Sequence, residues 1–119
     1  MFLIIDDSET DRLITRLLLE DSYSNHKIVE LEGAQEGIAW LKRNVQSEKT
    51  CILLDIKMPE INGFEFLDLY DKLSDTVKHN TTIYMISSSL DPNDIKRANE
   101  HYYVKNLLEK PLNPDNIRL

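Results

Sequence analysis

Short, uninterrupted hydrophobic runs alternate along this chain with longer segments in which apolar residues recur every three or four positions. Two of the runs, at residues 2–5 and 51–54, contain no polar side chain and are typical of strands that are buried on both faces. Weaker segments predict three further strands, at residues 27–31, 82–86 and 105–109. The segment at 27–31 is short and β-branched, so we expect it near an edge of the sheet.

The segments between these strands have the spacing and the start signals of helices. Three apolar sets recur at helical spacing: Leu13, Ile14, Leu17 and Leu18; Ala34, Ile38, Leu41 and Val45; and Phe64, Leu67, Tyr70 and Leu73. Asp91-Pro92 and Asn113-Pro114 each combine a capping side chain with proline at the first helical position. They predict a helix that continues through Ile95, Ala98 and Tyr102, and a last helix of about one turn. Five such β/α units predict an α/β fold with a parallel sheet covered on both faces.

Length and composition narrow the class of protein. The chain has 119 residues, which fits one domain over residues 1–119, and its single cysteine excludes an intramolecular disulfide framework and favours a reducing compartment. With 14 basic and 21 acidic residues the formal net charge is −7, which argues against a nucleic-acid partner. No apolar run is long enough to span a bilayer, and the start of the chain lacks a signal-peptide pattern. We therefore expect a cytoplasmic protein without a membrane partner.

Polar residues with complementary chemistry follow the predicted strands. Asp6-Asp7 follows the first strand, Asp55 the third, Ser87 the fourth and Lys110 the fifth. In an open parallel sheet, ligands bind beyond the carboxyl ends of the strands, so neighbouring first and third strands would gather three carboxylates in one crevice. Such a cluster is costly without a cation, and oxygen ligands favour Mg²⁺. With a lysine and a hydroxyl nearby, the set suits phosphoryl transfer onto a carboxylate.

Five sequence blocks carry a resemblance to a known family. The blocks are Ile4-Ile5-Asp6-Asp7, Leu53-Leu54-Asp55-Ile56-Lys57-Met58-Pro59, Asn62-Gly63, Ser87-Ser88 and Lys110-Pro111. In this order, and each at a strand end, they resemble the receiver domain of two-component response regulators over essentially the full chain. The resemblance implies a flavodoxin-like, doubly wound, five-stranded parallel sheet of order 2-1-3-4-5 with helices on both faces.

The resemblance also implies roles for individual residues. Asp55 would be the phosphoacceptor, and Mg²⁺ would be held by Asp55, by Asp7 directly, by Asp6 through water, and by the backbone carbonyl of Lys57. Lys110 would pair with the acceptor carboxylate and then with the phosphoryl group, and the Lys110–Pro111 peptide bond would be cis.

Signalling partners follow from the same resemblance. The phosphoryl donor would be a phosphohistidine of a sensor histidine kinase or phosphotransfer protein, and a downstream protein target would read the phosphorylated state. Ser87 would move its hydroxyl toward the phosphoryl group on activation; from the residues alone, Ser87 to Ser89 could equally cap the next helix.

One position departs from the family pattern and bears on the switch. Receiver domains usually carry Tyr or Phe three residues before the lysine of the fifth strand, where this chain has Leu107. Tyr102 and Tyr103 lie nearby but out of register. Our hypothesis is that the conformational change is carried mainly by the loop after Ser87 and the helix that begins at Asp91, and only weakly by the fifth strand.

Two other functions compete with a phosphorylatable signalling switch. A phosphohydrolase of the haloacid-dehalogenase type also uses a strand-end Asp nucleophile, but it needs a second Asp two residues later, where this chain has Lys57. A degenerate receiver that never accepts phosphate would be a constitutive binding module, but all five site positions are filled here. We therefore expect a switch that assists its own phosphorylation and dephosphorylation, not a turnover enzyme.

Overall fold

Five parallel strands form one sheet in the order β2-β1-β3-β4-β5, as the resemblance implied. The structure is a computed structural model and describes residues 1–44 and 48–119. The strands are β1 (Phe2–Ile5), β2 (Ile28–Leu31), β3 (Thr50–Asp55), β4 (Thr81–Ser87) and β5 (Val104–Glu109). The helices are α1 (Glu9–Ser22), α2 (Ala34–Arg43), α3 (Gly63–Asp71), α4 (Asp75–Asn80), α5 (Pro92–Glu100) and the 3₁₀ turn η1 (Pro114–Asn116).

The hydrophobic content of each strand matches its place in the sheet. All residues of β1 and β3 are buried, and these two strands lie next to each other at the centre of the sheet. β2 is only half-buried and lies at one edge, as its short, mixed sequence predicted. Chain order therefore reverses between β1 and β3, which is where an open parallel sheet forms its ligand crevice.

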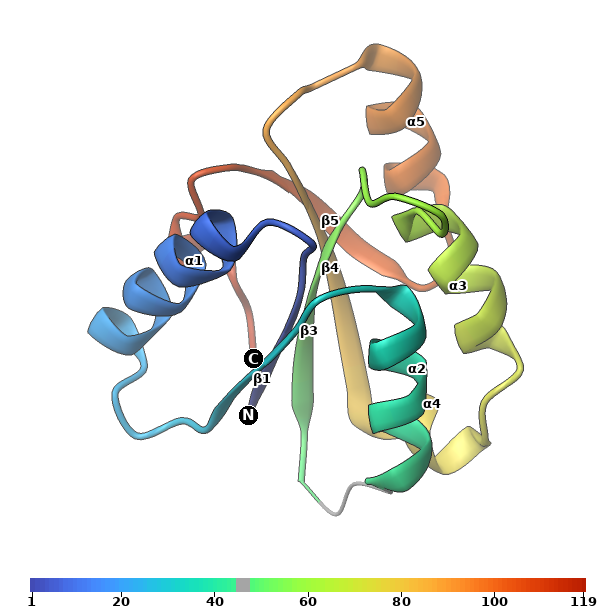
Figure 1. The fold of residues 1–119 in the computed structure, drawn as a ribbon, viewed down its shortest axis with the longest axis horizontal. Helices are drawn as coiled ribbons and strands as arrows, with labels where there is room; N and C mark the ends of the chain where they lie inside the picture. Colours follow the sequence, from blue (N-terminus) through green and yellow to red (C-terminus); the bar gives the residue numbers. More distant parts are fainter. Residues whose placement is uncertain (45–47) are drawn as a thin grey trace.

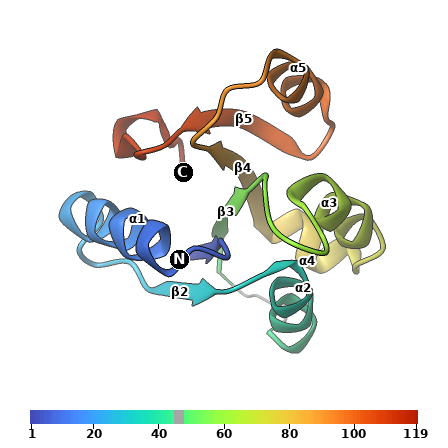
Figure 2. The ribbon, with the colours of Figure 1, turned by 45° about the horizontal axis from the view of Figure 1, so that its top comes forward.

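Helices cover both faces of the sheet. Figure 1 shows α1 on one side and α2, α3 and α5 on the other, and Figure 2 shows the same layers from a second direction. The face under α2, α3 and α5 buries a core that includes Leu3, Ile52, Phe66 and Met85. The opposite face buries Phe2, Leu53 and Tyr84 beneath α1 and the C-terminal segment, which adds Leu112 and Ile117.

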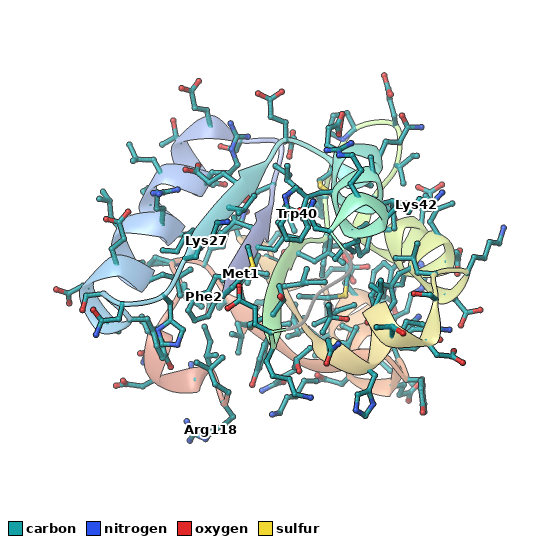
Figure 3. The ribbon with its side chains drawn as sticks, turned by 90° about the horizontal axis from the view of Figure 1, so that it is seen from below. Met1, Phe2, Lys27, Trp40, Lys42 and Arg118 are labelled. Atoms are coloured by element: carbon teal, nitrogen blue, oxygen red, sulfur yellow. The ribbon has the colours of Figure 1, made fainter. Side chains whose placement is uncertain are left out.

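The amino-terminal ends of the strands form the end of the sheet remote from the polar strand ends. Figure 3 looks at this end and shows Met1 and Phe2 at the start of β1, near Lys27. The ladder begins there with a hydrogen bond from the Phe2 amide to the Lys27 carbonyl at 2.8 Å. Trp40 of α2 packs against the core, and Phe64 and Phe66 are buried, so these aromatic rings serve packing.

The hydrophobic pattern of α1 is wrong for three of its four predicted residues, and only Leu18 packs against the core. Leu13, Ile14 and Leu17 are exposed by 52%, 42% and 55%, whereas the helix buries Arg12, Thr15 and Leu19. The reason is that the inner face of α1 must supply polar contacts beside the strand ends as well as apolar contacts. The exposed leucines and isoleucine therefore form an apolar stripe on the outer face of the helix.

Three other local predictions need correction, and one cannot be compared. The third predicted helix ends at Asp71, so Leu73 is buried in the loop after it. A short helix not expected from the sequence, α4, follows, because Ser74 caps the Val77 amide and Val77 is buried. Tyr102 lies beyond α5 and is 92% exposed. Val45 lies outside the described residues. Within the described ranges, no helix is both long and apolar enough to cross a membrane.

The start of α3 is packed so closely against β3 that only glycine fits at its first position. A Cβ atom on Gly63 would lie 2.7 Å from the backbone oxygen of Asp55 and 2.8 Å from Met85. We expect Gly63→Ala to lower the free energy of unfolding by about 2–3 kcal/mol, because backbone cannot yield as a side chain can.

Gly33→Ala is the matched control for this prediction. A Cβ atom there would meet only the end of the Glu36 side chain, at 2.8 Å, and that side chain is exposed and can move. We expect it to cost less than about 1 kcal/mol. Urea denaturation of both variants compares the two costs, and equal costs would contradict the close approach of α3 to β3.

Candidate functional site

The register of the central strands places two of the predicted carboxylates side by side. Ile5 of β1 pairs with Leu54 of β3, so the residues that follow them, Asp6 and Asp55, leave the sheet next to each other. Asp6 is fully buried and Asp55 is 6% exposed. The ladder continues past the strand ends, since the Asp6 amide donates to Leu31 at 3.1 Å.

Asp7 completes the acidic cluster from the solvent side. One carboxylate oxygen from each of Asp6, Asp7 and Asp55 lies within 4.8 Å of the others. Asp7 is exposed, whereas both oxygens of Asp6 already accept hydrogen bonds, one from the Ser8 amide at 2.9 Å and one from Lys110 at 2.8 Å. This donor set consists of oxygen only, which fits a hard divalent cation such as Mg²⁺.

Lys110 brings the positive charge to the cluster from β5. Its Nζ atom lies 2.8 Å from Asp6, 3.0 Å from Asp11 and 3.2 Å from Asp55. The backbone holds the lysine there, because its amide donates to the Ser87 carbonyl at 2.9 Å. The Lys110–Pro111 peptide bond is cis, as the resemblance implied.

The pKa directions in the cluster follow from burial and from these contacts. Burial, together with the neighbouring charge of Asp6, raises the pKa of Asp55 to about 6, although Lys110 acts in the opposite direction. Burial lowers the pKa of Lys110, but its hydrogen bonds to Asp6 and Asp11 and the charge of Asp55 outweigh that effect and raise it. Lys110 is therefore charged at neutral pH, and Asp55 is mostly ionised.

Asp11 belongs to this cluster, although its position three residues after Ser8 has only the capping pattern of a helix start. Its amide is capped by the Ser8 hydroxyl at 3.2 Å, as that pattern indicated, but its carboxylate reaches Lys110. A signal was available in the sequence, because Asp11 lies in the first turn of the helix that begins directly after the acidic pair. The partner could not be identified, because Lys110 is 99 residues away along the chain.

Arg12 is a second unexpected polar residue, and it supports the backbone of the cluster. Its Nη1 atom donates to the backbone carbonyl of Asp6 at 2.7 Å, in a buried position. Its Nε atom lies 3.6 Å from Glu30 of β2. Arg12 thus links the end of β1 to β2 and fixes the point at which the chain leaves the sheet.

Ser87 lies at the end of β4, almost fully buried, and its hydroxyl is engaged within its own loop. The Oγ atom donates to the Ser89 carbonyl at 2.7 Å and accepts from the Ser89 amide at 3.2 Å. The hydroxyl would have to exchange these contacts to reach a group on Asp55.

The remaining positions singled out in the sequence lie around the rim of the site or away from it. Lys57 lies in the loop after β3, with an exposed side chain beside a hollow lined also by Asp94 and Arg97. Leu107 is half-buried and packs against the core under α5. Tyr103 hydrogen-bonds Asp71 at the far end of α3, and so it does not substitute for the usual aromatic residue of β5.

The raised pKa of Asp55 predicts a pH-dependent effect of Asp55→Asn on stability without metal. Between pH 4 and pH 6 the native state binds a proton on Asp55 that the unfolded state has lost, so the wild-type chain loses stability as pH rises through this window. We expect Asp55→Asn to match the wild type near pH 3.5 and to exceed it by about 1–2 kcal/mol above pH 7.

Urea denaturation in a chelator at several pH values measures this difference. The control is Asp68→Asn, because the Asp68 side chain is exposed and makes no ion pair or hydrogen bond among the described residues. The raised pKa of Asp55 would be contradicted if the stability difference between Asp55→Asn and the wild type did not change with pH. It would also be contradicted if Asp55→Asn were less stable than the wild type at pH 8.

Comparison with known proteins adds curated relatives from bacteria and plants. The chain is 26% identical over 110 residues to the sensory/regulatory protein RpfC of Xanthomonas campestris pv. campestris, covering 92% of this chain and 14% of that protein. It is 28% identical over 117 residues to the two-component response regulator ORR1 of Oryza sativa, covering 91% of this chain and 50% of that protein. The chain thus spans half or less of the length of these relatives.

Solved structures and a family match agree with the geometry. A response regulator receiver protein from Dyadobacter fermentans is 35% identical with a TM-score of 0.86, covering 94% of this chain and 87% of that chain. A two-component response regulator from Cytophaga hutchinsonii is 26% identical with a TM-score of 0.86, covering 96% and 87%. Residues 2–119 match the response regulator receiver domain, so this chain belongs to that family of phosphorylatable signalling switches of two-component systems.

Proposed function

We propose that this chain accepts a phosphoryl group onto Asp55 from a phosphohistidine of a sensor histidine kinase or a phosphotransfer protein. The observation that carries the proposal is the position of the Asp55 carboxylate, which lies within 4.8 Å of two further carboxylates and 3.2 Å from the Lys110 ammonium. A carboxylate so placed has a positive charge on one side and room for a cation on the other.

The chain's own residues contribute nucleophilicity and charge. Asp55 attacks as the carboxylate, and its pKa of about 6 leaves it mostly ionised at pH 7 while keeping it more basic than an ordinary aspartate. Lys110 offsets charge on Asp55 and, afterwards, on the phosphoryl oxygens. Because this transfer needs mainly positioning and charge neutralisation, a cluster without a separate general base is sufficient.

The acidic cluster fits Mg²⁺ by its chemistry. Asp7, Asp55 and the backbone carbonyl of Lys57 would hold the ion, with Asp6 acting through water because both of its oxygens are already engaged. Bound there, the ion would neutralise the carboxylates and the phosphoryl oxygens together. Asp6, Asp7, Asp55, Lys57, Ser87 and Lys110 are thus the site residues we propose.

The outer face of α1 supports a protein as the donor. Leu13, Ile14 and Leu17 are exposed there, and Ile14 lines a hollow together with Lys110. An apolar stripe beside a phosphoryl-transfer site suits a partner that docks before transfer. A downstream protein target and a cytoplasmic location stay predictions, as does the absence of nucleic-acid and membrane partners.

The competing phosphohydrolase function gains no support from the site. The position two residues after Asp55, where that function needs an acidic group, is Lys57, which lines the rim hollow together with Asp94 and Arg97. The receiver family acts as a signalling switch and not as a conventional enzyme.

Phosphorylation by acetyl phosphate tests the acceptor directly. We expect the wild-type chain to gain one phosphoryl group in the presence of Mg²⁺ and none with a chelator, because the transfer needs neutralised oxygens. Asp55→Asn should fold and remain unlabelled, whereas the control Asp68→Asn should label like the wild type. Intact-mass spectrometry at neutral pH reads the result, and stoichiometric labelling of Asp55→Asn would refute Asp55 as the single acceptor.

Removing the Ser87 hydroxyl tests how phosphorylation is read out. We expect Ser87→Ala to accept a phosphoryl group on Asp55 but to lose the change in amide exchange over residues 87–102. The reason is that this variant has no hydroxyl that could leave the Ser89 backbone and move to the phosphoryl group. Ser89→Ala is the control, since the Ser87 hydroxyl bonds only the backbone of Ser89. Exchange with and without beryllofluoride measures the response; changes confined to residues around Leu107 in the wild type would show that β5 carries the switch.

A further inference from the structure

Lys110 has a third carboxylate partner, Asp11, that the phosphoryl-transfer site does not require. The Lys110 Nζ atom donates hydrogen bonds to Asp6 at 2.8 Å and to Asp11 at 3.0 Å, and it forms an ion pair with Asp55 at 3.2 Å. A phosphoryl group on Asp55 brings new oxygens that also need a donor from Lys110. Asp6 and Asp11 therefore compete with those oxygens for the ammonium group.

The surroundings of the three acceptors identify the one that can leave. Asp6 is fully buried, and its other oxygen is held by the Ser8 amide, so releasing it would strand a buried carboxylate. Asp55 carries the phosphoryl group itself. The Asp11 side chain is 38% exposed and borders a hollow of about 300 Å³ that Ile14, Ser88 and Pro111 also line. Its carboxylate can therefore swing into water.

Resting on the function proposed above, we infer that Asp11 is a positioning residue that competes with the phosphoryl group for Lys110. In the unphosphorylated chain, Asp11 holds the ammonium toward α1. On phosphorylation, Lys110 transfers that N–H from Asp11 to a phosphoryl oxygen, and Asp11 becomes hydrated. The exchange lowers the net affinity of the site for a phosphoryl group and opposes activation.

The first turn of α1 provides a charge-matched control. Glu9 lies in the same turn, is exposed, and its side chain makes no hydrogen bond or ion pair among the described residues. Glu9→Gln therefore removes one negative charge from the same helix end without touching Lys110. Asp11→Asn removes the charge and weakens the acceptor, and Asp11→Ala removes the acceptor altogether.

Beryllofluoride binding in saturating Mg²⁺ tests the inference, with Mg²⁺ affinity alone as a second measurement. We expect Asp11→Asn and Asp11→Ala to bind beryllofluoride about two- to fivefold more tightly than the wild type, and Glu9→Gln to stay within about 1.5-fold of it. Mg²⁺ affinity should be the same in Asp11→Asn and Glu9→Gln, because Asp11 competes for the lysine and not for the metal. Asp11→Glu, which restores a carboxylate, should return beryllofluoride affinity toward the wild-type value.

Each alternative result has a distinct meaning. If Asp11→Asn binds beryllofluoride no more tightly than Glu9→Gln, Asp11 does not compete and the inference is wrong. If both Asp11 variants bind it more weakly, Asp11 supports Lys110 in the bound state, which also overturns the inference. If the wild-type chain itself fails to bind beryllofluoride and to label with acetyl phosphate, the proposed function fails, whatever the role of Asp11.

Discussion

The candidate site at the carboxyl ends of the strands depends on the balance between like-charged carboxylates and one ammonium group. Parallel strands all end at the same edge, so an aspartate at the end of β1 and another at the end of β3 are forced together by the backbone. Burial makes their repulsion costly, as the raised pKa of Asp55 shows. The Lys110 ammonium offsets that cost by touching three carboxylates at once.

The position of that ammonium depends on features remote from it in the sequence. β5 must pair with β4 in the register that places Glu109 opposite Ser87. The Lys110 amide then continues the ladder by donating to the Ser87 carbonyl. On the other side, Arg12 ties the backbone of Asp6 to α1, and the Ser8 amide orients its carboxylate. The apolar interior of β1 and β3 keeps these contacts in place, so the site depends on a rigid sheet with adjustable loops around it.

The hydroxyl and the ammonium group nearest to Asp55 already have partners within the chain. The Ser87 hydroxyl is satisfied by Ser89, and Lys110 donates to Asp6 and Asp11 and forms an ion pair with Asp55. On the function and the inference proposed above, a phosphoryl group on Asp55 would draw on both groups, and it would change the contacts of the loop after β4 and of the start of α1 together. Leu107 has no polar atom in its side chain to join such an exchange, which is why our hypothesis assigns the response to the loop after Ser87 and to α5.

The sequence by itself determined those features that neighbouring residues encode. Uninterrupted apolar runs predicted β1 and β3, Asp91-Pro92 and Asn113-Pro114 predicted the start of α5 and of η1, and strand-end acids predicted the site. The resemblance added the strand order and the cis bond before Pro111, both confirmed. Each of these depends on local pattern or on family likeness, and neither requires knowledge of which side chains meet.

Only the tertiary structure decided which residues complete the cluster and which face α1 buries. The periodicity of apolar residues predicts a hydrophobic stripe on a helix, but it does not determine which face the helix turns toward the sheet. The inner face of α1 lies beside polar strand ends and buries Arg12 and Thr15. Leu13, Ile14 and Leu17 therefore face outward. Asp11 reads locally as a helix-start residue because its partner Lys110 lies almost the whole chain away. Contacts between distant segments depend on the packing of the sheet, which no local pattern records.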